Sequence, residues 1–444
     1  MALGREHDEE EADSLFNKAS SLHCKGETRS QAEELYRQVL KIQPHHAEAQ
    51  HILGALLIQL HGEKKYDEAR ALVQLAINQR PSCAKYRHSL GVIYHTCGKN
   101  KEAVDAFERA NEKDPLNIQI LSSLGQALRD VGRNMRAAEV WRSVSQLDPE
   151  HPTAHYRRAT CLKSVEGRSE EALSALRQHQ RLFPGCEKTR FWIAAMSGDA
   201  AAMQAMPSDL VAGLFDQYAD NFDEHLVQQL QYKTPQLLLD AMLVLRGHTA
   251  HWDLAVDLGC GTGLMGPLLR SHVTILEGVD LSSAMVEKAR ERGCYDRLAV
   301  TELAEYLSQH TARKPLTLYN LLVAADVFVY IGDLAPVMQS AAEHSDQGAI
   351  FAFSCESLEH RLDNITTKNG SCTVHAPSSN QLHIEDTDRS YAITASGRYA
   401  HSEQYLQTVS QKCGWKVLLC KSEVIRYNSG KPVHGHLCLM ERIP

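Results

Sequence analysis

Residues 256–263, which read VDLGCGTG, combine residue types and a spacing that could bind a ligand. Asp257 lies near the end of an apolar run, and glycines follow at every second position: Gly259, Gly261 and Gly263. Glycine adopts positive φ readily and has no side chain, so the backbone can turn tightly and approach a ligand closely. A carboxylate at the tip of a strand can also meet a ligand's ammonium group. The pattern therefore predicts a ligand-binding loop between a strand and a helix.

A second acid, Asp280, closes the next apolar run in the sequence GVDLS. A carboxylate at this place can accept hydrogen bonds from both hydroxyls of a ribose, each worth about 1.5–3 kcal/mol because the acceptor is charged. The carboxyl ends of parallel strands meet at one edge of a sheet. Asp257, the glycines and Asp280 together therefore describe a nucleoside site.

Two nucleoside ligands fit this description. Residues 261–266 match the dinucleotide fingerprint GxGxxG, with Asp280 following at an acceptable distance. In that alignment, however, the first glycine lies beyond the end of the strand, and Asp257 would repel a pyrophosphate. A nucleoside with a cationic amino-acid end would be attracted to Asp257 instead. The pattern favours this second ligand, with a glycine turn that binds nothing as a third alternative.

The sequence from Pro207 onward predicts the elements that position these residues, because apolar runs of strand length alternate with helical patterns. Helices are expected at 283–292 and 334–343. A last pair of strands flanks the turn 428–430 and forms an antiparallel edge. A polar insertion, 357–398, precedes that pair and is either a lid or an irregular excursion. The expected strands are 254–258, 274–279, 299–301, 318–324, 349–353, 415–426 and 434–441.

The first part of the chain is repetitive. Prolines recur about 34 residues apart, each after a helical pattern that it ends, at Pro44, Pro81, Pro115, Pro149 and Pro184. Alanines keep the same register at Ala32, Ala69, Ala103, Ala137 and Ala172. Small residues at these positions allow two helices of one unit to pack closely. The sequence therefore predicts an all-α array of about five helical pairs over residues 13–186.

This array resembles tetratricopeptide repeats, most clearly at 84–117 and 118–151. The resemblance implies a solenoid whose groove docks a protein or peptide, and we expect residues 187–206 to form a helix that seals the last repeat. The mildly basic lining would suit an acidic or extended peptide, although an ordinary solvated face is an equal alternative. The implied groove residues are Lys85, His88, His95, Arg129, Tyr156 and Lys163.

The order of the acids and glycines in the second part resembles class I S-adenosylmethionine-dependent methyltransferases. The resemblance implies an α/β doubly wound (Rossmann-like) domain over 207–444. The segment around Tyr218 would fold over the cofactor or, alternatively, belong to the core. Asn320 departs from the aspartate of many relatives at a place distant from the methyl group. The implied cofactor-binding residues are Asp257, Gly259, Gly261, Gly263, Asp280, Leu281, Glu302, Leu303, Ala325 and Tyr218.

Three residues are candidates for a general base, which methyl transfer needs only when the acceptor must lose a proton. His401 and Tyr399 follow the insertion, and Glu356 follows the fifth expected strand. Each has a structural alternative, since His401 could be a packed side chain and Glu356 a solvated loop acid. Arg398 could bind an acidic acceptor or pair with an acid.

The composition limits the partners. The formal net charge of −8 gives no support for binding to nucleic acid or an anionic membrane, and the 12 cysteines show no metal-ligand spacing. We expect no metal, no membrane span and a cytoplasmic location. The sequence as a whole predicts methyl transfer to an unidentified small molecule or protein. A scaffold with an inactive methyltransferase fold and, with less support, an NAD-dependent oxidoreductase remain alternatives.

Overall fold

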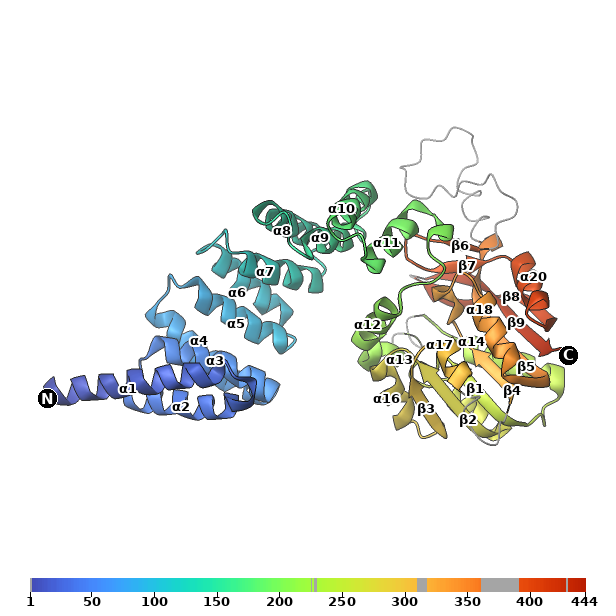
Figure 1. Ribbon diagram of the computed structural model, residues 1–444, viewed down its shortest axis with the longest axis horizontal. Helices are drawn as coiled ribbons and strands as arrows, with labels where there is room; N and C mark the ends of the chain where they lie inside the picture. Colours follow the sequence, from blue (N-terminus) through green and yellow to red (C-terminus); the bar gives the residue numbers. More distant parts are fainter. Residues whose placement is uncertain (1, 225, 227–229, 310–317, 361–390, 429) are drawn as a thin grey trace. The chain divides into compact units, whose positions relative to one another are not determined.

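The chain folds into two compact units, Met1–Pro184 and Gly185–Pro444. The computed structural model describes residues 2–224, 226, 230–309, 318–360, 391–428 and 430–444 (Figure 1). Within these ranges, none of the helices has the length and the apolar character needed to cross a membrane. Most of the predicted insertion 357–398 lies outside the described residues.

The first unit is built of helices that pack in consecutive pairs, each pair contacting the next (Figure 1). The all-α repeat array predicted from the sequence is therefore confirmed. The first helices of neighbouring pairs also touch one another, α3 with α5 and α5 with α7. The helices are α1 (Ala2–His23), α2 (Arg29–Ile42), α3 (Ala47–His61), α4 (Tyr66–Gln79), α5 (Ala84–Thr96), α6 (Asn100–Asn111), α7 (Ile118–Asp130), α8 (Asn134–Leu147), α9 (Ala154–Leu162) and α10 (Ser169–Leu182).

Small residues in the first helix of a pair make room for large ones in the second. A Cβ on Gly91 would lie 2.5 Å from Cε1 of Phe107, and one on Gly125 would lie 2.7 Å from Nε1 of Trp141. Both contacts are closer than real side chains tolerate, so only glycine permits this helix spacing. The recurrence of small residues in the sequence thus reflects the packing of each helical pair.

In the described part of the second unit, nine strands form one mixed sheet that helices cover. Its strands are β1 (Trp252–Leu258), β2 (Val273–Asp280), β3 (Arg297–Val300), β4 (Tyr319–Ala324), β5 (Ser345–Ser357), β6 (Tyr391–Ile393), β7 (Tyr399–His401), β8 (Trp415–Asn428) and β9 (Lys431–Arg442). Its helices include α11 (Glu187–Ser197), α12 (Ser208–Tyr218), α13 (Phe222–Glu224), α14 (Thr234–Arg246), α15 (Gly266–Leu269), α16 (Ser283–Glu291), α17 (Leu303–Gln309), α18 (Ala335–Glu343) and α20 (Glu403–Lys412).

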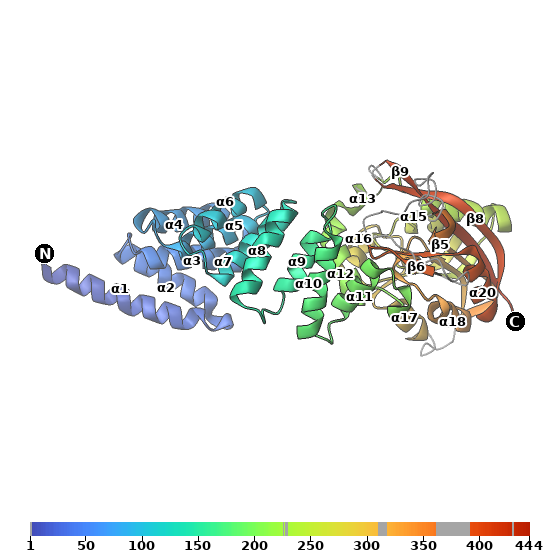
Figure 2. The same ribbon diagram turned by 90° about the horizontal axis from the view of Figure 1, so that it is seen from above.

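The strand order confirms the predicted doubly wound fold. Strands β3, β2, β1, β4 and β5 are parallel neighbours (Figure 1). Strands β9 and β8 follow β5 as antiparallel strands at the edge (Figure 2). The short strands β6 and β7 were not predicted. Strand β7 pairs with the last residues of β5, beyond the point where its pairing with β4 stops.

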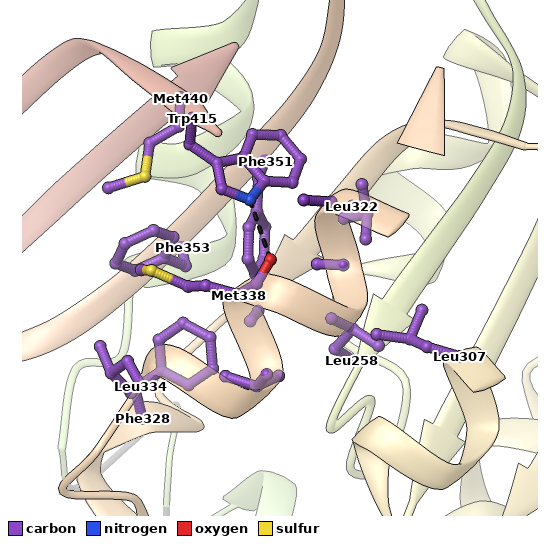
Figure 3. Close-up of a cluster of buried hydrophobic side chains, with 14 of the residues drawn as sticks. Leu258, Leu307, Leu322, Phe328, Leu334, Met338, Phe351, Phe353, Trp415 and Met440 are labelled. Carbon is purple, nitrogen blue, oxygen red and sulfur yellow. Dashed lines mark hydrogen bonds between the residues drawn. The ribbon is translucent and has the colours of Figure 1, made fainter. Parts of the chain in front are cut away.

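Alternate residues along each central strand face two separate hydrophobic cores. On β5, Phe351 and Phe353 face the core formed with α17, α18 and α20, whereas Ile350 and Ala352 face the core formed with α14. Figure 3 shows the first of these cores, in which the indole Nε1 of Trp415 donates to the carbonyl oxygen of Met338 at 3.0 Å. The continuous apolar runs of these strands are explained by burial on both faces.

Helix α11, which we expected to close the last repeat, belongs to the second unit. Phe191 and Trp192 on this helix are buried and lie against Gly397, in the turn between β6 and β7. The φ angle of Gly397 is +82°, and a Cβ there would lie 3.1 Å from both rings. These contacts fasten α11 to the turn between β6 and β7.

Candidate functional site

A cavity of about 640 Å³ lies at the carboxyl ends of the parallel strands. Strand β1 pairs with β2 on one side and with β4 on the other, so the crossover connections diverge at its end. Doubly wound sheets bind ligands in the crevice that forms at this place. The volume falls within the range of about 300–1,000 Å³ that is usual for small-molecule sites.

The glycine loop after β1 shapes one wall of the cavity. Gly259, Gly261 and Gly263 all have positive φ, at 72°, 53° and 83°. The amide of Gly261 donates to Oδ2 of Asp280 at 2.9 Å, and the amide of Ser282 donates to Oδ1 at 2.9 Å. Two backbone donors thus hold the Asp280 carboxylate against the loop at the end of β2.

Asp257 is 1% exposed and lies at the floor of the cavity. Burial raises the pKa of this carboxyl group to about 7, the nearby Asp280 adds to the rise, and a hydrogen bond from Tyr295 opposes it. The Tyr295 hydroxyl donates to Oδ2 of Asp257 at 2.7 Å. A buried acid of this kind is stabilised in its charged form by a cationic partner.

Tyr295 was missed by the sequence analysis, and three glycines make space for its ring. A Cβ on Gly263, Gly266 or Gly278 would lie 3.0 Å or less from a ring carbon. Gly263 is not among the described residues that line the cavity, because it faces Tyr295 and Ala289. Gly263 therefore supports the orientation of Asp257 through Tyr295.

The segment α12–α13 covers the cavity and is tied to the loops by polar contacts. Asp216 accepts hydrogen bonds from Ser282 at 2.5 Å and from the amide of Ala284 at 3.3 Å. Asp223 accepts a hydrogen bond from Thr262 at 2.5 Å and pairs with Arg292. Three aromatic residues of the segment line the cavity: Phe215, Tyr218 and Phe222.

The other predicted cofactor residues also reach the cavity. Glu302 accepts a hydrogen bond from Ser208, the first residue of α12. Asn320 lies elsewhere, with Oδ1 accepting from the amide of Leu254 at 3.0 Å and Nδ2 donating to Asp346 at 2.9 Å. Nine of the ten predicted residues line the cavity: Asp257, Gly259, Gly261, Asp280, Leu281, Glu302, Leu303, Ala325 and Tyr218.

None of the three candidate bases is among the described residues that line the cavity. His401 is fully buried, and its Nε2 contacts the carbonyl oxygen of Gly332 at 3.0 Å. Tyr399 donates to the carbonyl oxygen of Met203 at 2.8 Å. Glu356 is not a solvated loop acid, because it is 2% exposed and pairs with buried Arg426. Each of the three residues thus has a partner within the fold, and their role as a general base stays a prediction.

A buried ion-pair network forms the polar wall at the end of β4. Asp326 has a φ of 58°, which is unusual outside glycine. Its Oδ1 accepts a hydrogen bond from the Ser354 hydroxyl at 2.9 Å. Arg426 of β8 donates to Oδ2 of Asp326 at 2.7 Å and also pairs with Glu356. Arg398 lies 3.5 Å from Glu356 and lines the cavity.

Tyr232 completes this wall. Burial raises the pKa of its hydroxyl well above the usual value, so the group stays protonated. The sequence analysis missed both Tyr232 and Arg426. The one local sign that Arg426 is part of the site was its charge within the otherwise apolar strand sequence VIRY.

The predicted groove residues lie on the first helices of the repeats, or just after α9 in the case of Lys163. Glu48 offsets part of the charge of Lys85, from which it lies 3.3 Å away, and Nε2 of His95 lies 2.9 Å from Oδ2 of Asp130. Burial lowers the pKa of Lys163 to about 7, which reduces its charge further. The remaining contacts are Arg129 with Asp130 at 3.4 Å, His88 with Ser123 at 2.9 Å, and the ring of Tyr156 with that of His179 at 5.6 Å.

Comparison with protein families assigns both parts of the chain. A methyltransferase-domain model matches residues 256–351, which contain the glycine loop and Asp280. Tetratricopeptide-repeat models match residues 29–93, 84–115 and 123–185. The fold and the site thus define a doubly wound domain with a crevice at the carboxyl ends of its parallel strands. The chain combines tetratricopeptide repeats with a methyltransferase domain.

Individual relatives match only parts of the chain. Methyltransferase-like protein 27 of Homo sapiens is 35% identical over 92 residues, which are 20% of this chain and 37% of that protein. Superkiller complex protein 3 of Mus musculus is 26% identical over 149 residues, 33% of this chain and 9% of that protein. The chain therefore spans less than two thirds of either relative.

Solved structures with similar parts include both kinds of unit. Magnesium protoporphyrin IX methyltransferase (ChlM) from Synechocystis PCC 6803, with bound SAH, is 13% identical, and the match covers 53% of this chain and all of that one with a TM-score of 0.37. YrrB, a TPR protein with an unusual peptide-binding site, is 21% identical, and the match covers 41% of this chain and 92% of that one with a TM-score of 0.35.

Proposed function

We propose that the second unit binds S-adenosylmethionine and transfers its methyl group to an acceptor. The observation that carries this proposal is a pair of acids, buried Asp257 and half-buried Asp280, on either side of a glycine loop in the crevice. Asp257 would meet the ammonium group of the amino-acid end, and Asp280 the ribose hydroxyls. Asp257 would repel a pyrophosphate, which disfavours a dinucleotide.

The shape of the cavity supports the same ligand. Gly259 brings the backbone against Val327, and the aromatic residues of α12–α13 cover the opposite side. Glu302 lies at the end of the cavity where an adenine amino group could donate to it. When bound, the sulfonium supplies a methyl group that its own positive charge already activates.

The residues of the chain would contribute position and exclusion of water. Asp257 and Asp280 fix the two ends of the cofactor, and Phe215, Tyr218 and Phe222 shield the centre. The acceptor would enter beside Asp326, Arg398 and Tyr232, where Tyr232 keeps its hydroxyl proton. Methyl transfer to an acceptor without a proton to lose needs no base from this wall.

Transfer of a labelled methyl group from S-adenosylmethionine to components of a cell extract tests this function. The whole protein is expected to label an acceptor, and the Asp280→Ala variant is expected not to. Cofactor binding without labelling of any small-molecule or protein fraction would support the inactive scaffold instead. A fluorescence titration with NADH tests the oxidoreductase, and binding of NADH but not of S-adenosylhomocysteine would overturn the proposal.

The affinity for S-adenosylhomocysteine is expected to rise about tenfold between pH 6 and pH 8. The reason is that the Asp257 carboxyl group, whose pKa is about 7, must be ionised to bind an ammonium group. Calorimetric titration at several pH values measures this change. Tyr295→Phe removes the hydrogen bond that lowers this pKa, so the midpoint should move to higher pH. Equal affinity at pH 6 and pH 8 would refute this role of Asp257.

We infer that the repeats dock a protein partner or acceptor through their first helices, as the repeat family commonly does. The double variant Lys85→Glu and Arg129→Glu should lower the rate of labelling of a protein acceptor at least about tenfold. Lys101→Glu, on the second helix α6, is the matched control. Unchanged labelling by the double variant would exclude these residues from docking.

A further inference from the structure

Two cysteines lie directly opposite each other on the edge hairpin. Cys420 of β8 pairs in register with Cys438 of β9, and their Sγ atoms are 3.5 Å apart. Directly opposed residues of antiparallel strands have Cα atoms about 4.5–5.5 Å apart, a separation that a disulfide spans without backbone movement. Cys438 is fully buried, whereas Cys420 is partly exposed. The fold thus presents one accessible thiol with a second directly behind it.

A histidine and a carboxylate stand on the same face of the sheet. His436 lies two residues before Cys438 on β9, and its Nε2 is 3.1 Å from Oε2 of Glu359. The other carboxylate oxygen of Glu359 accepts from the amide of Glu403 at 2.8 Å, which fixes the carboxylate at the start of α20. The imidazole is 3% exposed, so its orientation is held by packing.

These neighbours favour a thiolate at Cys420. The hydrogen bond with Cys438 lowers the pKa of Cys420 to about 6 against the effect of burial, and His436 contributes to the decrease. Burial by itself would lower the pKa of His436, but the contacts with Cys420 and Glu359 raise it to about 9. At neutral pH the pair is therefore an imidazolium beside a thiolate, the arrangement that activates cysteine nucleophiles.

We propose that Cys420 and Cys438 form a dithiol site that a hydroperoxide oxidises to a cross-strand disulfide. The Cys420 thiolate attacks one peroxide oxygen, the O–O bond breaks, and the departing oxygen takes a proton from the His436 imidazolium. Cys438 then loses its proton to His436 and attacks the sulfenic sulfur of Cys420. The S–S bond forms, the S–O bond breaks, and the hydroxide leaves as water after taking up that proton. Two thiols lose two electrons, and hydrogen peroxide is reduced to two waters.

This site is separate from the cavity. None of Cys420, Cys438 and His436 is among the described residues that line it. The inference therefore stands independently of the proposed methyl transfer. Cys355, which faces His436 on β5, is fully buried behind the pair, so it serves as an internal comparison for access.

Treatment of the folded, full-length protein with hydrogen peroxide, followed by alkylation and peptide mass mapping, tests the proposal. A linked pair of peptides containing Cys420 and Cys438 is expected, while exposed Cys24 remains alkylable. The rate of Cys420 alkylation at pH 6.5 should fall about tenfold in His436→Gln, because less thiolate is present. In Cys438→Ser, Cys420 should accumulate as sulfenic acid, which a dimedone probe detects.

Other outcomes would overturn the proposal. One is a disulfide between Cys420 and a cysteine other than Cys438. Another is that Cys420 and Cys438 both remain free thiols under conditions that already oxidise Cys24. If Cys420 is alkylated no faster than Cys24, His436 does not activate the Cys420 thiol, and the proposal is likewise overturned. Circular dichroism of each variant before treatment establishes that the fold is intact, and the mapping of the unsubstituted protein does not depend on any variant.

Discussion

Asp280→Ala is expected to lower the affinity for S-adenosylhomocysteine by at least about 100-fold. The carboxylate would accept two ribose hydroxyls, and each such charge-assisted hydrogen bond is worth about 1.5–3 kcal/mol. The change also removes the acceptor of the Gly261 and Ser282 amides, so the loop loses its preferred arrangement. Calorimetric titration of the purified variant measures the effect.

Asp240→Ala is the matched control, because Asp240 is an exposed acid on α14 in the same unit. Its affinity should equal that of the unsubstituted protein. The melting temperature of both variants separates lost binding from lost folding. If Asp280→Ala binds as tightly as the control while remaining folded, the nucleoside does not lie against β2.

Gly259→Ala is expected to abolish detectable cofactor binding and to lower the melting temperature by roughly 5–15 °C. A Cβ at this position would lie 2.5 Å from Cγ2 of Val327, and the φ angle of +72° is unfavourable for alanine. Overpacking costs about 1–3 kcal/mol, and the left-handed backbone adds about 1–2 kcal/mol. To relieve this contact, the glycine loop or Val327 must shift. Because both line the cavity, the shift would disturb the surface that the ligand contacts.

Gly348→Ala separates the two causes. Gly348 has a similar φ of +79°, but a Cβ there would have no neighbour within 4 Å. This variant should lose only the free energy of folding that the left-handed backbone costs, about 1–2 kcal/mol, and should bind the cofactor normally. Thermal melting and calorimetry measure the stability and the cofactor affinity of both variants. Equal losses of stability and affinity in the two would contradict the close contact between the loop and Val327.

The fold and most of the cavity lining could be predicted because their signals are local. Asp257, the glycines and Asp280 lie at strand ends that periodicity locates, and a parallel sheet brings those ends together. The repeats were visible for a similar reason, since each helical pair meets the same packing demand at the same positions, such as Gly91 and Gly125.

The polar wall and the supporting residues could not be predicted, because they depend on contacts between distant segments. Tyr295 reaches Asp257 only because several glycines from separate elements leave space for its ring. Arg426 arrives from β8, one hundred residues after Asp326. His401 looked reactive by its residue type, whereas the structure buries it beneath the loop at Gly332. Residue type and order along the chain contain no information on such burial.

The interaction of the whole protein with S-adenosylhomocysteine, measured by isothermal titration calorimetry, tests the central claim most directly. The account predicts binding at one site per chain with a dissociation constant of about 1–100 μM, equivalent to about 5.5–8 kcal/mol. No heat of binding from a protein whose circular dichroism and melting show an intact fold would contradict it. In that case the repeats would be the functional part of the chain.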